Sequence, residues 1–255
     1  PGPDVVFAVR EEGAPAGPFE GAAVVLVDDL TVLTGAADAA AAARLAREFA
    51  GSYPIEARPN GKIVDVEIVA APAELEMLDG RRLAVWAYNG AVPGPEIRLR
   101  LGDTLRARFT NRLPQPTTIH WHGVRLPNAM DGVPALTQPP VAPGARFEYR
   151  FRPPDAGTFW YHAAGGRQLE QGLHGALIVE EAEPVRVDRD IVLVLGTAGP
   201  VGGGVPPVRV NGLSRPDVPV ISGERLRLRL INATAARGLA FKVEVDAADD
   251  DVHRR

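Results

Sequence analysis

Residues 96–111, EIRLRLGDTLRARFTN, decide the fold class of this chain because apolar and charged side chains alternate along them in two runs. Successive side chains of a β-strand point to opposite faces, so this alternation is typical of strands that bury one face. The pair Gly102-Asp103 separates the two runs and indicates a tight turn. The stretch therefore predicts two strands joined by a turn and not a helix.

Short apolar or alternating runs, broken by turn residues, continue in both directions from this stretch. Further strands are predicted at 63–70, 83–88, 117–122, 147–151, 157–162, 175–180, 190–195, 208–210 and 225–231. The chain also has 27 glycines and 24 prolines in 255 residues, against a usual combined share of ~12%. Many short strands with no long helix between them predict an all-β chain that folds as a Greek-key sandwich.

The strand pattern divides the chain into three parts. Residues 1–61 differ from the rest: 24–27 is a candidate short strand, and 38–50 is rich in strong helix formers. We therefore expect a short helical N-terminal extension of unknown role. Residues 62–184 hold enough predicted strands for one complete sandwich, and residues 185–255 hold too few for another. The expected organisation is one complete domain followed by a second, partial one.

Charge and composition exclude several classes of function. The formal net charge is −4, so the chain has no excess of positive charge with which to bind the phosphates of nucleic acid. Cysteine is absent, so these residues form no disulfide, no catalytic thiolate and no metal site that needs a cysteine ligand. No run approaches ~18 consecutive apolar residues, so no membrane span is predicted.

Histidine is scarce, with five in the chain, and two of them lie in the tripeptide His120-Trp121-His122. On a strand, residues two apart point to the same face, so both imidazoles project together and Trp121 projects the opposite way. This arrangement suits two ligands that reach into one metal site or onto neighbouring metal ions. Taken alone, such a pair more often consists of two half-buried polar residues on a sheet face.

The residues around this pair resemble the first cupredoxin domain of the multicopper oxidases, the laccase-like enzymes. The matching motifs are TTIHWHGVRLPNAMDGVPALTQPPVAPG at 117–144, GTFWYH at 157–162 and GLHGALIVEE at 172–181. The resemblance covers about residues 62–240 and is most specific between Asn111 and Glu181. It implies a cupredoxin-like Greek-key β-sandwich with copper as the cofactor.

The resemblance also implies roles for individual residues. His120 corresponds to a ligand of the type 2 copper, and His122 and His162 correspond to ligands of the type 3 coppers. Asp131 corresponds to a carboxylate that helps deliver protons to oxygen. Imidazole is a strong neutral ligand for copper, and a nearby carboxylate can relay protons. The family couples the oxidation of phenols or metal ions to the reduction of dioxygen, so the implied partners are dioxygen and a small-molecule or metal-ion reductant.

The chain departs from the family pattern in two places. Ala164 stands where the family has a further type 3 histidine, and alanine has no donor atom. The histidine–cysteine–histidine motif of the family's last domain is absent as well. We therefore expect part of a trinuclear copper site, no type 1 site and no oxidase activity of the isolated chain. A partner chain or a missing C-terminal cupredoxin domain is expected to supply the other ligands.

Two alternatives remain open on sequence alone. The first is a degenerate cupredoxin scaffold, or a mononuclear copper-binding module, without oxidase activity. The second is a relative of the two-domain copper nitrite reductases, although Ala163 then stands in place of the type 1 cysteine. Proteins of the resembled family are usually exported, which implies a periplasmic or extracellular location.

The remaining candidate residues have simpler interpretations. We expect His174 to lie on a turn as a packing or surface residue, and His253 to be solvated in a polar tail. The aromatic run at 159–161 is interpreted as sandwich core and not as an electron-transfer path. Met130 lies close to the motif in sequence, but its position is not one that the resembled family uses for a ligand.

Overall fold

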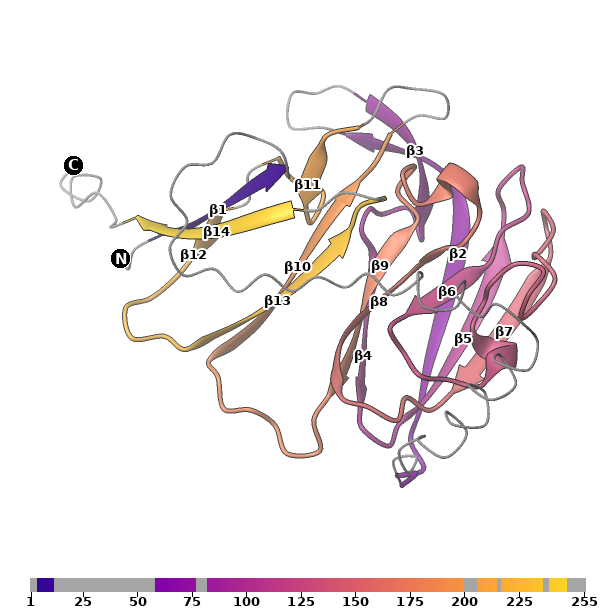
Figure 1. Ribbon diagram of the computed structural model, residues 1–255, viewed down its shortest axis with the longest axis horizontal. Helices are drawn as coiled ribbons and strands as arrows, with labels where there is room; N and C mark the ends of the chain where they lie inside the picture. The colour runs from indigo at the N-terminus through magenta and orange to yellow at the C-terminus, as the bar shows by residue number, and fades with distance from the viewer. Residues whose placement is uncertain are drawn as a thin grey trace, which may run out of the picture.

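The computed structural model describes residues 4–11, 58–76, 82–199, 206–214, 217–235 and 239–246. Within these ranges the chain consists of β-strands without an α-helix, together with two 3-10 helices, η2 at Asn128–Met130 and η3 at Gly166–Gln168 (Figure 1). The all-β prediction is confirmed. The strand expected at 24–27, the helix expected at 38–50 and His253 lie outside the described residues. None of the described helices is long and apolar enough to cross a membrane.

Two four-stranded sheets form a sandwich in the middle of the chain. The first sheet has the order β3-β2-β5-β7, and its strands are Arg82–Tyr88, Ile63–Glu76, Thr104–Asn111 and Arg146–Phe151. The second has the order β4-β9-β8-β6, and its strands are Gly94–Arg100, His174–Glu180, Gly157–Ala163 and Ile119–His122. The pairs β2–β5 and β4–β9 are parallel and their other neighbours antiparallel. Chain crossovers of this kind are those expected of a Greek-key arrangement.

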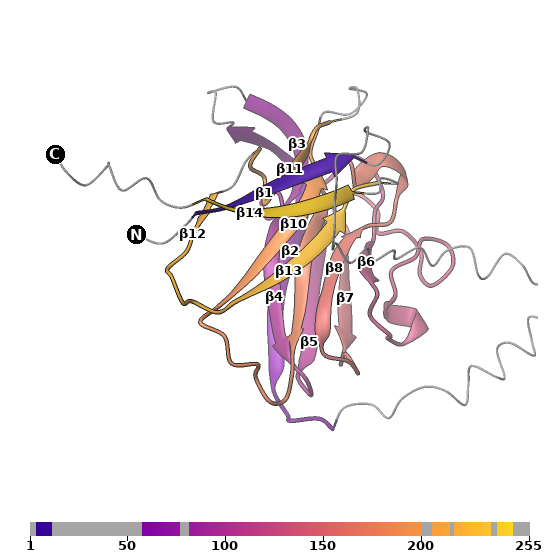
Figure 2. The same ribbon diagram turned by 60° about the vertical axis from the view of Figure 1, so that its left-hand side comes forward.

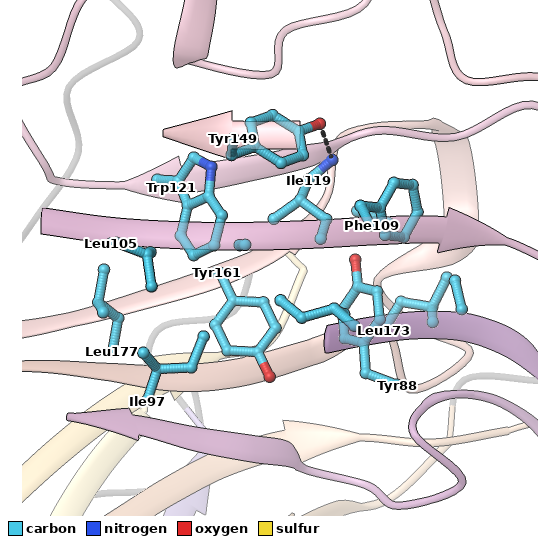
Figure 3. Packing of buried hydrophobic residues seen from close by; sticks show 14 of the residues in the cluster. Tyr88, Ile97, Leu105, Phe109, Ile119, Trp121, Tyr149, Tyr161, Leu173 and Leu177 are labelled. Carbon is cyan, nitrogen blue, oxygen red and sulfur yellow. Dashed lines mark hydrogen bonds between the residues drawn. The ribbon is translucent and has the colours of Figure 1, made fainter. Parts of the chain in front are cut away.

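The main apolar core lies between these two sheets (Figure 3). The alternation along β5 explains how it forms: Leu105, Ala107 and Phe109 are buried, while the arginines between them face outward. From the second sheet, Ile119 is fully buried, and its N–H donates to the Tyr149 hydroxyl at 2.9 Å. The core therefore fixes the position of β6, the short strand that carries two of the histidines.

Six further strands form two three-stranded sheets. The order β11-β10-β13 comprises Val208–Val210, Arg189–Thr197 and Leu226–Ala233, and the order β12-β1-β14 comprises Asp217–Pro219, Asp4–Glu11 and Leu239–Asp246. Figures 1 and 2 both show β1 and β14 lying beside β10 and β11. A small apolar cluster that includes Leu193, Val210 and Val218 joins the two sheets.

The β11-β10-β13 sheet covers part of the outer face of the second sheet. Ala176 and Ile178 of β9 pack against Val194 and Ile231 in a separate apolar cluster. A buried guanidinium strengthens this contact: Arg229, 3% exposed, donates to the Asp190 carboxylate at 2.7 Å and to the Thr158 hydroxyl at 3.0 Å. The strand β6 is one of the two edge strands of the second sheet, and β4 is the other.

The structure adds three strands that the sequence analysis did not predict, β1, β12 and β14. The N-terminal extension at 1–61 thus contains the strand β1, which pairs along its whole length with β14 at the other end of the chain. The two strands are so far apart in the sequence that no local pattern predicts their pairing. The prediction that His174 lies on a turn is wrong, because it begins β9 and is 1% exposed.

Candidate metal centre

The strand β6 separates its side chains as the sequence predicts. Trp121 is fully buried in the sandwich core, whereas His120 and His122 are partly buried on the opposite face. The rings of the two histidines lie 5.6 Å apart, centroid to centroid. Both imidazoles therefore project from the outer face of the second sheet.

The register between β6 and β8 brings the third histidine to this pair. His120 lies directly opposite His162, and His122 lies opposite Trp160. The Nδ1 atom of His122 is 3.2 Å from Nε2 of His162. One ring nitrogen from each of the three histidines lies within 4.8 Å of those of the other two. In the part of the chain that the structure describes, this is the one cluster of three such side chains that could hold a metal ion.

Asp131 orients the ring of His120. The backbone carbonyl oxygen of Asp131 is 2.8 Å from Nδ1 of His120, and one of its carboxylate oxygens is 3.2 Å from the same nitrogen. Burial acts to lower the pKa of His120, but the side-chain and backbone hydrogen bonds to Asp131 outweigh it and raise the pKa above 6.5. Because Nδ1 of His120 donates to Asp131, Nε2 is the ring nitrogen that is left to bind a metal ion.

The position of Asp131 depends on the turn that follows the 3-10 helix η2. Its N–H donates to the Asn128 carbonyl at 3.1 Å, and the next residue, Gly132, has a positive φ of 76°. A Cβ atom on Gly132 would lie 1.7 Å from the carbonyl oxygen of Ile119. Glycine is therefore needed at this point, because the turn passes directly against β6.

The other two histidines are uncharged at neutral pH. Burial lowers the pKa of His122, and it lowers the pKa of His162 to about 3. Nδ1 of His162 lies 2.9 Å from its acceptor, the carbonyl oxygen of Ala163. With that nitrogen donating, Nε2 of His162 presents a lone pair toward His122.

Trp160 supports two of the three imidazoles. Its ring is stacked on His162 at 4.3 Å and on His122 at 4.7 Å, with interplanar angles of 28° and 25°. Trp160 also packs against the apolar cluster that residues of β9, β10 and β13 form. The sequence analysis placed this tryptophan in the sandwich core, but in the structure Tyr161 alone of the run 159–161 is fully buried there. The motif gave no signal for the stacking, since His122 and Trp160 meet only through the register of two strands.

Several residues near the motif do not join the three histidines. Ala164, the position of the expected further ligand, follows β8 with a methyl side chain. The sulfur of Met130 accepts the backbone N–H of Arg150 at 3.2 Å. His174 lies opposite His162 in the register of β8 and β9, but its nitrogens also lie outside the cluster.

Comparison with known proteins gives a consistent match for this part of the chain. Residues 70–184 match the family model described as multicopper oxidase. Copper resistance protein A of Pseudomonas syringae pv. tomato is 41% identical over 138 residues, 53% of this chain and 22% of that protein. Multicopper oxidase MmcO of Mycobacterium tuberculosis is 38% identical over 141 residues, 54% of this chain and 28% of that protein.

The fold is also that of solved multicopper oxidases and is cupredoxin-like. The crystal structure of a multi-copper oxidase from Pseudomonas Thermotolerans superposes with a TM-score of 0.60 and 40% identity, covering 68% of this chain and 47% of that one. The chain thus spans 22% and 28% of the lengths of the two curated relatives.

Proposed function

This chain contains a domain of the multicopper oxidase family, at residues 70–184, and on that premise we propose that His120, His122 and His162 bind copper. The observation that carries the proposal is the convergence of their three ring nitrogens within 4.8 Å. The family binds copper, and imidazole is among the ligands that copper prefers. We further propose that residues 62–184 form one cupredoxin domain and residues 185–255 part of a second.

The protonation of the three rings supports this proposal. Nδ1 of His120 and Nδ1 of His162 each face a carbonyl oxygen, so each ring has Nε2 available as a ligand atom. Nδ1 of His122 and Nε2 of His162 approach to 3.2 Å, a contact that needs a proton between them in the metal-free chain. A cation replaces such a proton where lone pairs converge. The donor set therefore fits copper.

Bound copper supplies a redox centre that passes electrons from a reductant to dioxygen. The residues of this chain bind and orient it: Trp160 holds the rings of His122 and His162 by stacking, and Asp131 fixes His120. The Asp131 carboxylate is 30% exposed and 3.2 Å from Nδ1 of His120. We propose that it takes up protons from solvent and hands them on during oxygen reduction.

Complete oxidase activity needs more ligands than these residues supply. Ala164 offers no donor atom, and the 255 residues contain no cysteine for a type 1 site. We propose that the other ligands come from another cupredoxin domain or a partner chain, with a small molecule or metal ion as reductant, in the periplasm or outside the cell. A second candidate, a mononuclear copper-binding module, is favoured by the same two absences.

Copper stoichiometry tests both candidates. The chain is reconstituted with Cu(II), freed of excess metal and compared with a His120→Ala, His122→Ala double variant and a His253→Ala control. About one copper per chain with a type 2 paramagnetic signal and no blue band, lost only in the double variant, is the result expected of a three-histidine site. Absence of stoichiometric copper would show that this chain alone does not bind it. Oxidase turnover with several coppers would contradict the inference from Ala164.

Asp131→Asn is expected to weaken copper binding by about tenfold or more, because carboxylates behind a histidine ligand set its orientation and basicity. The same change should lower the pKa of His120, which the Asp131 hydrogen bonds now raise. Calorimetric titration with Cu(II) measures the first effect, and proton NMR of the metal-free chain measures the second.

Asp155→Asn is the matched control for this prediction, since Asp155 pairs with Arg125 and is not a member of the three-histidine cluster. If both variants bound copper as the unmodified chain does, Asp131 would have no role in holding the ligand.

A further inference from the structure

Arg229 is a buried arginine of β13, at the contact between the β11-β10-β13 sheet and the strand that carries His162. Its Nε donates to the two carboxylate oxygens of Asp190 at 2.7 and 3.0 Å, and Nη2 donates to the same carboxylate at 2.8 Å. The remaining nitrogen, Nη1, donates to the hydroxyl of Thr158 at 3.0 Å. Asp190 belongs to the same sheet as Arg229, whereas Thr158 belongs to β8. The guanidinium therefore joins two sheets by a directed hydrogen bond.

The outer face of β8 carries Thr158, Trp160 and His162 in a row. They alternate with Tyr161 and Ala163, which are buried in the sandwich core. Side chains two residues apart on a strand lie on one face at a spacing of ~6–7 Å. The indole of Trp160 is stacked on the ring of His162 at 4.3 Å. The residue that Arg229 binds is thus the first of a row that ends at a candidate metal ligand.

The side of β13 that faces β8 presents a matching row. Arg229, Ile231 and Ala233 are buried, and the residues between them are exposed. Ile231 and Ala233 belong to the apolar cluster against which Trp160 packs. Apolar contacts are non-directional, so this cluster alone does not fix how far β13 lies along β8. The hydrogen bond to Thr158 does fix it, because such a bond weakens away from its preferred length and angle.

We propose that Arg229 is a positioning residue for the three-histidine centre: it sets the place of β13 against β8 and, through Trp160, the orientation of the His122 and His162 rings. Its effect on metal binding rests on the proposed copper site, whereas its effect on the rings does not.

Arg229 acts on these rings by position and not by charge. Its hydrogen bonds hold the pKa of the Asp190 carboxyl below the usual range, so Asp190 is ionised and the pair carries no net charge. The pair alone lies within one sheet, since β10 and β13 are neighbours. The bond to Thr158 is the one that reaches β8.

Proton NMR of the metal-free chain measures the orientation of the rings, because the ring current of a stacked indole shifts the imidazole protons. Removing the guanidinium would leave the Asp190 carboxylate without its main partner and endanger folding. Thr158→Val removes only the acceptor, and Arg229→Lys keeps the charge but loses the fork of donors. We expect both variants to shift the ring resonances of His122 and His162.

Arg227→Gln is the matched control. Arg227 lies on the same strand, and its ion pair with Glu181 joins β13 to the residue after β9 and not to β8. It should leave the resonances of the two histidines unchanged. In calorimetric titration with Cu(II), Thr158→Val and Arg229→Lys should weaken the affinity by about threefold or more, and Arg227→Gln should not.

Three results would overturn the proposal: unchanged ring resonances in Thr158→Val and Arg229→Lys, equal shifts in Arg227→Gln, or ring shifts with an unchanged affinity for copper. Urea unfolding shows that each variant is folded before the spectra are compared. If the unmodified chain bound no copper, the proposed copper site would fail, but ring shifts confined to the two variants would still show that Arg229 orients the rings.

Discussion

Replacing Trp121 with alanine is expected to lower the free energy of unfolding by about 3–5 kcal/mol, the range for a large aromatic side chain removed from a core. Trp121 is fully buried and contacts the rings of Tyr149, Phe151 and Tyr161 at centroid distances of 5.5, 5.1 and 5.6 Å. Domains are usually stable by only ~5–15 kcal/mol, so the loss is a large fraction of the total. Urea unfolding followed by circular dichroism measures it.

The same substitution is expected to weaken copper binding without removing a ligand. Trp121 anchors β6, a strand of four residues at the edge of its sheet, and the neighbours of Trp121 on that strand are His120 and His122. Trp160→Ala is the comparison, because it removes the stacking on two histidines from a partly exposed position. Trp160→Ala should cost less stability than Trp121→Ala. Equal losses of stability would contradict the assignment of Trp121 as the anchor of β6.

The metal-free chain is expected to lose stability as the pH falls from about 6.5 to about 4. Burial lowers the pKa of His174 to about 4 and that of His162 to about 3, against 6.5 for an ordinary histidine. Between these values the unfolded chain binds more protons than the folded chain, so acid favours unfolding. For His174 alone the difference corresponds to about 3 kcal/mol. His120 acts in the opposite direction, because its pKa is raised in the folded chain.

Urea unfolding at a series of pH values, compared between the unmodified chain and His174→Gln, isolates this effect. Glutamine keeps a polar side chain but does not titrate, so the variant should lose less stability over the same pH interval. Parallel losses in the two proteins would show that His174 is not held neutral by burial. Carboxylates such as Glu181, whose pKa is lowered from 4.5 to about 2 mainly by its hydrogen bond to Arg227, lose their contribution as the pH falls below about 4.5. They are the same in both proteins, so their effect cancels in the comparison.

The outer face of the second sheet has two regions with different roles. Near β6 it carries the three histidines and is open enough for them to remain partly exposed. Near β9 it is covered by β10 and β13 and contains a small cavity lined by His174 and Thr197. Trp160 lies between these regions and contacts both, which links the three histidines to the packing of the next sheet.

The sequence by itself determined the features that depend on local geometry. Period-two alternation at 96–111 specified strands, and strand geometry alone placed His120 and His122 on one face with Trp121 on the other. Both follow from the direction of successive side chains along an extended backbone, which needs no knowledge of the rest of the fold. The resemblance then pointed to His162 as a third candidate ligand forty residues after His122, a role that the spacing alone did not give.

The tertiary structure alone decided how these residues meet. His162 faces His120, and Trp160 stacks on His122, because β6 and β8 pair in one particular register. Packing across the sandwich core selects that register, since a slip by one residue would turn Trp121 toward solvent. The pairing of β1 with β14 and the cavity beside β9 likewise join segments far apart in the chain. Such contacts depend on the whole folded core, so no local pattern in the sequence predicts them.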